Sequence, residues 1–230
     1  MVLRKRFFLF FSVIFILIST CIGTSRADDR RYDVAVIGAG SGGCSAAIQA
    51  ARMGMSVALI EESDWIGGQM TGAAVSTMDD KTKTRTGIYL EFITKVIEYY
   101  SARNTNYNIC YWGSDTIAFE PWAGQMILKE MLEKAGLIDI LVKTKLLSVK
   151  VSENRVRSVD VKVDGKSETI SAKIFIDATE CGDLIALSGA RYRAGNSISP
   201  AIDINAIIQD ITYPADRKST RLNSSHIPLS

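Results

Sequence analysis

A glycine-rich turn between an apolar run and an alanine-rich run limits what this chain can fold into. Residues 32–37 are apolar and rich in β-branched side chains, and 41–53 carry alanines at helical spacing before Gly54. A second apolar run covers 56–61. The turn between the first two runs reads Gly38-Ala39-Gly40-Ser41-Gly42-Gly43, the spacing G-x-G-x-x-G. We therefore expect a β-α-β unit whose right-handed crossover makes the two strands parallel neighbours.

Each glycine of this turn has a physical task. Gly38 permits the tight turn, Gly40 lacks the Cβ that would hold a diphosphate away, and Gly43 lets the helix approach the sheet. Backbone N–H groups of 40–43 would point at the diphosphate, which the helix dipole also favours. Glu61 would accept hydrogen bonds from the ribose and repel a 2′-phosphate. The predicted dinucleotide site, for FAD or NAD rather than NADP, comprises Gly38, Ala39, Gly40, Ser41, Gly42, Gly43 and Glu61.

The middle of the chain predicts two helices after a loop rich in Gly, Ser and Thr at 65–80. Apolar residues recur at helical spacing over 86–103. Pro121 opens the next helix, which is expected to run through Ala135 and stop at Gly136. Its inward stripe is predicted to consist of Trp122, Met126, Met131 and Leu132.

The following segment, 138–170, predicts a β-meander. Its first strand is expected at 140–144, and turns are expected at 153–154 and 164–165. A separate apolar strand at 173–177 and a short helix at 183–189 complete the domain, which contains no internal repeat. The predicted fold class is α/β, a Rossmann-like domain with a parallel sheet and an inserted β-meander.

Three segments resemble the FAD-dependent oxidoreductases of the glutathione-reductase and fumarate-reductase type, and the likeness covers 32–189. They are the glycine turn with its strand (33–43), the run Trp-Ile-Gly-Gly-Gln-Met (65–70) and the run Ile-Asp-Ala-Thr-Glu-Cys-Gly-Asp-Leu (176–184). The resemblance favours FAD as the cofactor. A β-meander at this place also favours FAD, because an NAD-dependent dehydrogenase more often continues with further βα units.

The resemblance also implies further cofactor contacts. In that family the Gly-Gly loop passes near the FAD diphosphate and ribityl chain. The strand that opens the meander contacts adenine through its backbone, and the Asp-Ala-Thr strand end packs beside the dinucleotide. The corresponding residues here are Gly67, Gly68, Gln69, Leu146, Ala178 and Thr179. The family commonly has Gly after the Thr, where this chain has Glu180.

By resemblance, the chain is expected to be an oxidoreductase that transfers hydride or electrons between a small-molecule substrate and an electron acceptor, both unidentified. No catalytic acid or base can be named, because the single histidine, His226, lies in the tail. Cys44, Cys110 and Cys181 form no Cys-x-x-Cys pair, so no metal site is predicted, and buried small side chains are the favoured interpretation. Two alternatives stay open: a truncated, non-catalytic dinucleotide-binding remnant, and an NAD-dependent dehydrogenase.

Both ends of the chain differ from its middle. Residues 1–27 read as a signal peptide, with the basic Arg4-Lys5-Arg6, a short apolar run and small residues before a cleavage site at Asp28. The protein is therefore expected to be exported, periplasmic or extracellular, and membrane-anchored only if this segment is retained. The chain as a whole carries a net charge of +2, but seven of its basic residues lie in 1–27 and 217–230, which contain no acid. The net charge of the middle is therefore −5, which does not suggest a nucleic-acid partner.

The expected organisation has four parts. Residues 1–27 are the signal peptide, and 28–189 are the FAD-binding domain. Residues 190–216 are interpreted as the start of a substrate domain that is largely missing. Residues 217–230 lose all periodicity and are interpreted as a non-native tail.

Overall fold

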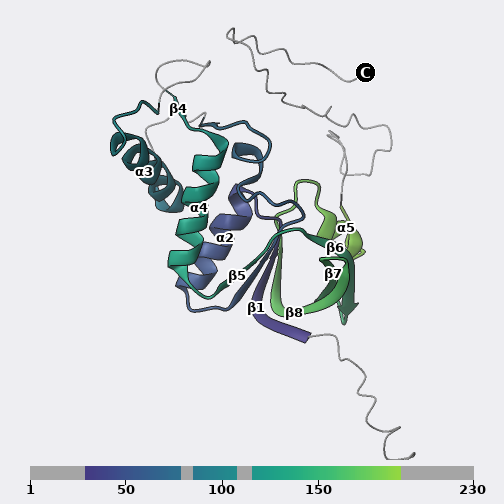
Figure 1. Ribbon diagram of the computed structural model, residues 1–230. Coiled ribbons are helices and arrows are strands. Elements are labelled where there is room, and N and C mark those ends of the chain that lie inside the picture. The colour runs from purple at the N-terminus through teal and green to yellow at the C-terminus, as the bar shows by residue number, and fades with distance from the viewer. Residues whose placement is uncertain (1–28, 79–84, 108–115, 193–230) are drawn as a thin grey trace, which may run out of the picture.

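A computed structural model describes residues 29–78, 85–107 and 116–192. The predicted signal peptide, the predicted tail and Cys110 lie outside these described residues, as does all but the beginning of the predicted substrate-domain segment. The described chain forms a six-stranded sheet with helices over one face (Figure 1). The strands, in spatial order, are β5 (Ile138–Leu141), β2 (Val57–Ile60), β1 (Asp29–Ile37), β8 (Lys166–Asp177), β7 (Arg155–Val163) and β6 (Thr144–Ser152).

The parallel half of the sheet is built around β1. β1 pairs in parallel with β2 on one side and with β8 on the other, and β2 pairs in parallel with β5. Val34 and Val36 of β1 are buried in one core cluster, whereas Ala35 and Ile37 are buried in the other. A strand buried on both faces reads as a continuous apolar run, as residues 34–37 of β1 do. The predicted parallel β-α-β unit is confirmed.

The antiparallel half is the predicted meander, in which β7 pairs with both β6 and β8. Its two turns have positive φ at both central residues, 53° and 60° at Glu153 and Asn154, and 47° and 81° at Asp164 and Gly165. Such turns match the twist of a two-residue hairpin. β8 is a single strand of 12 residues, so the separate strand predicted at 173–177 is its second half.

One predicted strand of the meander was wrong. The segment expected at 140–144 ends earlier, as β5, and pairs with β2 at the opposite edge of the sheet. The meander itself begins at Thr144. A run of four residues with three apolar side chains fits a parallel edge strand as well as a hairpin strand, so the sequence pattern did not identify the partner of β5.

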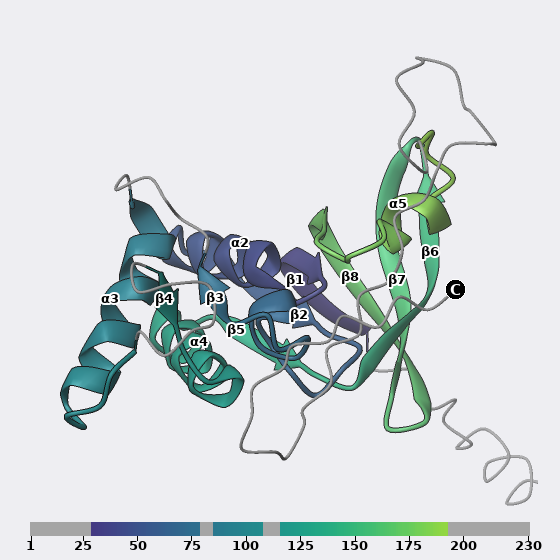
Figure 2. The same cartoon turned by 90° about the horizontal axis from the view of Figure 1, so that it is seen from above.

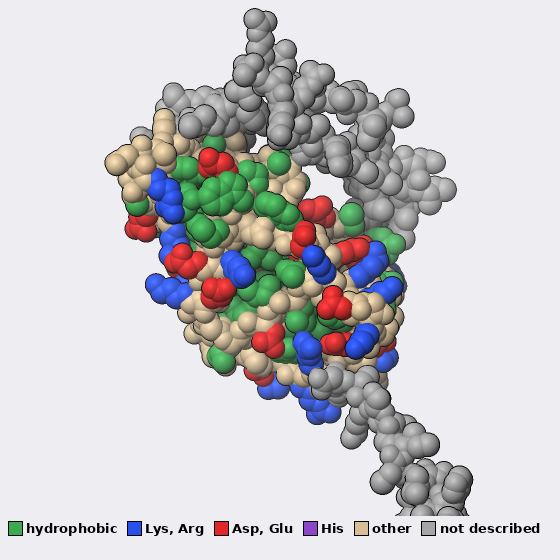
Figure 3. All heavy atoms as spheres, in the orientation of Figure 1, with side chains coloured by type: hydrophobic (Ala, Val, Ile, Leu, Met, Phe, Trp, Pro, Cys, Tyr) green, Lys and Arg blue, Asp and Glu red, His purple; other side chains and the backbone are tan. Residues whose placement is uncertain are grey.

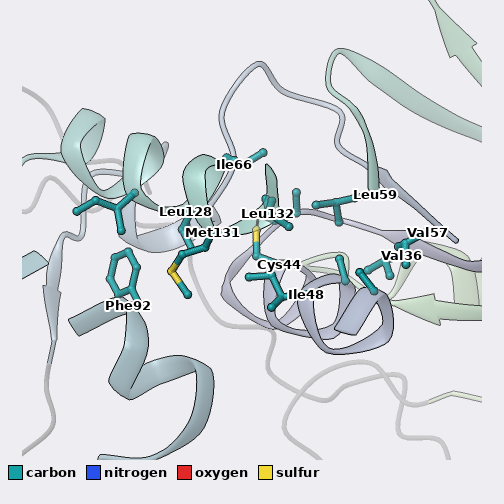
Figure 4. Packing of buried hydrophobic residues seen from close by; sticks show 14 of the residues in the cluster. Val36, Cys44, Ile48, Val57, Leu59, Ile66, Phe92, Leu128, Met131 and Leu132 are labelled. Carbon is teal, nitrogen blue, oxygen red and sulfur yellow. Dashed lines mark hydrogen bonds between the residues drawn. The ribbon is translucent and has the colours of Figure 1, made fainter. Parts of the chain in front are cut away.

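Helices α2 (Ser41–Arg52) and α4 (Pro121–Ala135) pack against one face of the sheet, and α3 (Gly87–Ser101) packs against α4. Seen from above, α3 and α4 lie at one end of the molecule and the β6–β7 hairpin lies at the other (Figure 2). Figure 4 shows how the larger core cluster joins the sheet to these helices, with side chains from β1, β2 and all three helices in contact. The labelled members are Val36, Cys44, Ile48, Val57, Leu59, Ile66, Phe92, Leu128, Met131 and Leu132.

The bounds of α4 agree with the prediction, but half of its predicted inward stripe was wrong. Met131 and Leu132 are buried, whereas Trp122 is 52% exposed and Met126 is 40% exposed. Trp122 makes an edge-to-face contact with Tyr99 of α3, with ring centroids 5.9 Å apart. Hydrophobic side chains gather on this surface over α3 and α4 (Figure 3). Smaller residues, including Ala123 and Gly124, take the inward positions because α4 lies close to its neighbours.

The remaining elements are short: η1 (Gly68–Met70), β3 (Thr77–Met78), β4 (Ile117–Ala118) and α5 (Asp183–Leu187). None of the helices in the described part of the chain is both long and apolar enough to cross a membrane.

Asp33 links β1 to the start of β2 and to β8. Its Oδ2 accepts hydrogen bonds from the N–H and the hydroxyl of Ser56, both at 2.9 Å, beside β2. Its Oδ1 accepts one from Nζ of Lys173 in β8, at 2.6 Å. The hydrogen bond from Lys173, followed by those from Ser56, lowers the pKa of Asp33 from 3.8 to about 2.

This lowered pKa makes these links sensitive to acid. The charged carboxylate stabilises the fold above pH 3.8, and this contribution is lost as the pH falls toward about 2. Asp33→Asn should therefore have a lower free energy of unfolding at neutral pH and a smaller loss of stability on acidification. Urea unfolding at a series of pH values measures both. Asp64→Asn removes an exposed carboxylate far from these links and should keep the wild-type pH dependence. The same acid sensitivity in Asp33→Asn as in wild type would contradict the assignment.

Candidate functional site

A groove of about 510 Å³ opens at the carboxyl ends of β1, β2 and β8. The ends of parallel strands are where α/β sheets generally bind ligands. Seven of the residues predicted to hold the cofactor line it, although they come from five separate segments of the chain. They are Gly38, Gly40, Glu61, Gly68, Leu146, Ala178 and Thr179.

Two glycines of the turn are required by close backbone contacts. Gly38 has a φ of 96°, and a Cβ there would collide with the backbone of Ala178 at the end of β8. A Cβ on Gly43 would collide with the carbonyl of Gly38. These contacts draw α2 and the β8 end onto the same turn, as the sequence predicted for Gly38 and Gly43.

Gly40 has a different role, because a Cβ there would meet nothing within 4 Å. Gly40 is the N-cap of α2, which has no side-chain cap and no acid in its first turn. The first turn of a helix has backbone N–H groups without intrahelical acceptors, and its dipole favours an anion. The free space at Gly40, next to these donors, fits a diphosphate held by main-chain N–H groups.

Glu61 is fixed at the other side of the groove, just after β2. One carboxylate oxygen accepts the N–H of Ala39 at 2.8 Å, and the other accepts the N–H of Ser63 at 2.9 Å. These bonds tie the end of β2 to the glycine turn. Each carboxylate oxygen can accept more than one hydrogen bond, so both can still receive ribose hydroxyls.

The Gly67-Gly68 segment lies directly against the glycine turn. The N–H of Gly67 donates to the carbonyl of Ala39 at 2.7 Å, and Gly67 pairs with Gly40 as a parallel bridge. Both glycines of the segment have positive φ, 105° and 56°. A Cβ on Gly68 would lie 3.0 Å from the Cα of Gly40. Bare main chain therefore faces bare main chain at this point of the groove.

The end of β8, Asp-Ala-Thr at 177–179, forms another wall of the groove. Asp177 accepts hydrogen bonds from the N–H and hydroxyl of Thr179, at 3.0 and 2.7 Å, and from the N–H of Ile185 in α5 at 2.8 Å. The N–H of Ala178 donates to the carbonyl of Ile37 at 2.8 Å. Asp177 thus holds the turn, and Ala178 and Thr179 line the groove.

A second cavity, of about 740 Å³, lies beside the N-terminus of α2. Three predicted residues, Ser41, Gly42 and Gln69, line it rather than the groove. The rest of its described lining comes mainly from apolar side chains of η1, β3, α3 and α4. The two hollows, the groove and this cavity, are neighbours: Gly40 and Gly68 line the groove, and the next residues, Ser41 and Gln69, line the cavity.

Three predicted residues line neither hollow: Ala39, Gly43 and Gly67. They build the walls through the contacts described above. The sequence did not single out Thr144, Trp65 or Asp183, which do line the groove. Trp65 and Asp183 lie within the runs 65–70 and 176–184 that carry the resemblance, where neither was named as a cofactor contact, and Thr144 is two residues before Leu146. Only the three-dimensional course of β6 and α5 brings Thr144 and Asp183 to the groove.

Two of the cysteines can be assigned. Cys44 is buried and its thiol donates to the carbonyl of Ala39 at 3.2 Å. Burial raises the pKa of Cys44 to about 12, which makes it an unreactive core residue. Cys181 is exposed and lines the groove, so the favoured interpretation of the cysteines as buried side chains was wrong for Cys181. Both are free thiols.

The family model described as FAD dependent oxidoreductase matches residues 33–214. The chain belongs to this family. The sequence prediction of FAD as the dinucleotide is therefore confirmed, as is its preference over NAD. Within the described ranges, no group of three or more His, Cys, Asp or Glu could hold a metal ion.

The chain is also similar to several known proteins. The chain is 30% identical over 162 residues to digeranylgeranylglycerophospholipid reductase 1 of Methanococcoides burtonii, covering 64% of this chain and 37% of that protein. It is 25% identical over 209 residues to a tRNA uridine 5-carboxymethylaminomethyl modification enzyme of Geobacter metallireducens, covering 84% and 31%. A geranylgeranyl bacteriochlorophyll reductase-like protein of Thermoplasma acidophilum shares the fold, with a TM-score of 0.52 and 20% identity over 70% and 43% of the two chains. The chain spans less than half the length of each.

The turn contains one crowded glycine, Gly43, and one glycine in open space, Gly42, which together test how tightly α2 packs against the sheet. Gly43→Ala should lower the free energy of unfolding by about 1–3 kcal/mol, because its methyl group forces α2 away from Gly38. Gly42→Ala places the same methyl group in open space and should leave stability unchanged or raise it by up to about 1 kcal/mol. Urea unfolding of both variants, without cofactor, measures the difference. Equal stabilities would mean that Gly43 is not tightly packed.

Proposed function

We propose that this chain is the FAD-binding part of an exported flavoprotein oxidoreductase, which transfers hydride or electrons between a small-molecule substrate and an electron acceptor. Family membership supports the redox activity. The observation that carries the proposal is the open space at Gly40, beside an uncapped helix N-terminus, with Glu61 fixed across the groove.

The residues of the groove would hold FAD by its adenosine diphosphate half. Main-chain N–H groups in the first turn of α2 donate to the diphosphate, and Glu61 accepts from the ribose hydroxyls. The backbone near Leu146, at the start of β6, contacts adenine. FAD supplies the two-electron redox chemistry when it is bound. The chain contributes orientation and a fixed set of hydrogen-bond donors and acceptors.

The apolar cavity is the proposed place for the flavin half and for the substrate beside it. It begins where the groove ends, at Ser41 and Gln69, and Met70, Met78 and Phe92 form part of its wall. No charged side chain is among its described lining residues. Apolar walls around a cofactor exclude water and so prevent side reactions with it. The negative charge of the middle of the chain argues against a nucleic-acid partner.

A bulky side chain at Gly40 tests the binding proposal. Gly40 has φ −65° and ψ −174°, which any residue can adopt, so Gly40→Leu should fold with at most about 1 kcal/mol lost at the N-cap. The new side chain fills the groove, and the dissociation constant for FAD should rise at least about tenfold. Titration followed by flavin fluorescence measures it.

Gln49→Leu is the matched control, because it adds the same side chain at an exposed position of α2 outside both hollows. This variant should bind FAD as wild type does. Unchanged FAD affinity in Gly40→Leu, with the fold intact, would overturn the proposed site.

The proposal of export rests on residues 1–27. We expect a bacterial host that secretes the protein to release a chain that begins at Asp28. N-terminal sequencing or intact mass of the secreted chain measures this. Replacing Arg4-Lys5-Arg6 with glutamines should retain the uncleaved protein inside the cell, because the basic segment orients a signal peptide. Recovery of the uncleaved wild-type chain in the cytoplasm would contradict export.

A further inference from the structure

The groove proposed for an anionic cofactor is itself acidic. Among its described lining residues are four carboxylates and no Lys or Arg: Glu61, Glu62, Glu180 and Asp183. An anion there is attracted only by main-chain dipoles, and it meets whatever carboxylate charge is left uncompensated. The effect of each carboxylate depends on its partners.

Three of the four carboxylates have compensating neighbours. Glu61 accepts two main-chain N–H groups. Glu62 pairs with Nζ of Lys145 at 2.6 Å. The same ammonium group compensates Asp183. The pKa of Lys145 is raised mainly by its hydrogen bond to Glu62, and to a smaller extent by the negative charge of Asp183. Glu180 is exposed and has neither an ion pair nor a hydrogen bond with any residue that the structure describes.

The uncompensated carboxylate also lies close to the glycines. A Cβ built on Gly68 would lie 3.0 Å from the Cα of Gly40 and 3.8 Å from Oε1 of Glu180. Gly40, Gly68 and the Glu180 carboxylate therefore surround one point of the groove. This point adjoins the open space that Gly40 leaves for the diphosphate.

We propose that Glu180 is a specificity-determining residue that weakens the binding of ligands through their phosphate charge. The inference rests on the proposed function, since it concerns the same groove. Both phosphates of FAD are ionised at neutral pH, and like charges a few ångströms apart repel each other. Glu180 thus selects against ligands with more phosphate groups and limits the affinity for FAD itself. Its repulsion is exposed to solvent and is therefore screened by salt.

Neutralising this carboxylate tests the proposal. In the full chain, Glu180→Gln should lower the dissociation constant for FAD by about fivefold at low salt, as expected for removing a repulsion of about 1 kcal/mol. The difference from wild type should shrink toward none at about 1 M NaCl, where the Debye length is only about 3 Å. Fluorescence titration with FAD at both salt concentrations gives the four constants.

Two controls separate charge at the groove from charge in general. Glu153→Gln makes the same change in the turn after β6, about 25 Å along that strand from Leu146, and should leave FAD binding unchanged. Adenosine has no phosphate, so its dissociation constant should be the same for Glu180→Gln and wild type. ADP should bind more tightly to Glu180→Gln, as FAD does. Calorimetry with adenosine and ADP measures both.

The outcomes separate the two proposals. Equal FAD affinity in Glu180→Gln and wild type, at both salt concentrations, overturns the role of Glu180 and leaves the proposed function standing. Weaker binding by Glu180→Gln also overturns it, because the carboxylate would then be accepting a hydrogen bond from the cofactor. FAD binding by neither protein overturns the proposed function and this inference together. Tighter FAD binding by Glu180→Gln that disappears at high salt supports both.

Discussion

The contact of Gly38 with Ala178 and with Gly43 is the constraint on which the candidate site depends. Main chain meets main chain there without an intervening side chain, at the crossing of β1, α2 and the end of β8. A single added methyl group at Gly38 or Gly43 would overlap backbone atoms, so the three segments can approach this closely only with glycine at both positions. The positions of the N–H donors at Gly40 and of the wall at Thr179 both follow from this contact.

Hydrogen bonds then convert this close approach into a defined groove. Glu61 joins β2 to the turn through Ala39, and Gly67 joins the following loop to the same residue. Asp177 holds the opposite wall through Thr179 and Ile185. Ala39 thus receives one segment at its N–H and another at its carbonyl, although it lines neither hollow. It joins two segments of the site without facing the ligand space.

Local patterns predicted much of this arrangement. The glycine spacing and the apolar runs identified the β-α-β unit, and the turn residues 153–154 and 164–165 identified the hairpins. The resemblance brought Gly68, Leu146 and Ala178 to the site, which spacing alone does not do. Pairing between distant segments was harder, because the four residues of β5 carry no signal that distinguishes β2 from β6 as a partner. The prediction for Trp122 was wrong because the helical spacing of apolar residues does not take their size into account. At the start of α4 the inward positions are occupied by the smaller Ala123 and Gly124, and Trp122 is exposed.

β8 has a wider consequence for how the domain behaves. Its first half pairs with β7, and nearly its whole length pairs with β1, so one strand belongs to both the antiparallel and the parallel halves of the sheet. Separating the hairpins from the rest would remove the hydrogen-bonding edge of β1 and open the smaller core cluster, where Val159, Val161 and Ile170 are buried. We therefore expect the two halves to unfold as one cooperative unit, because the described part of the sheet is continuous through β8 from one wall of the groove to the other.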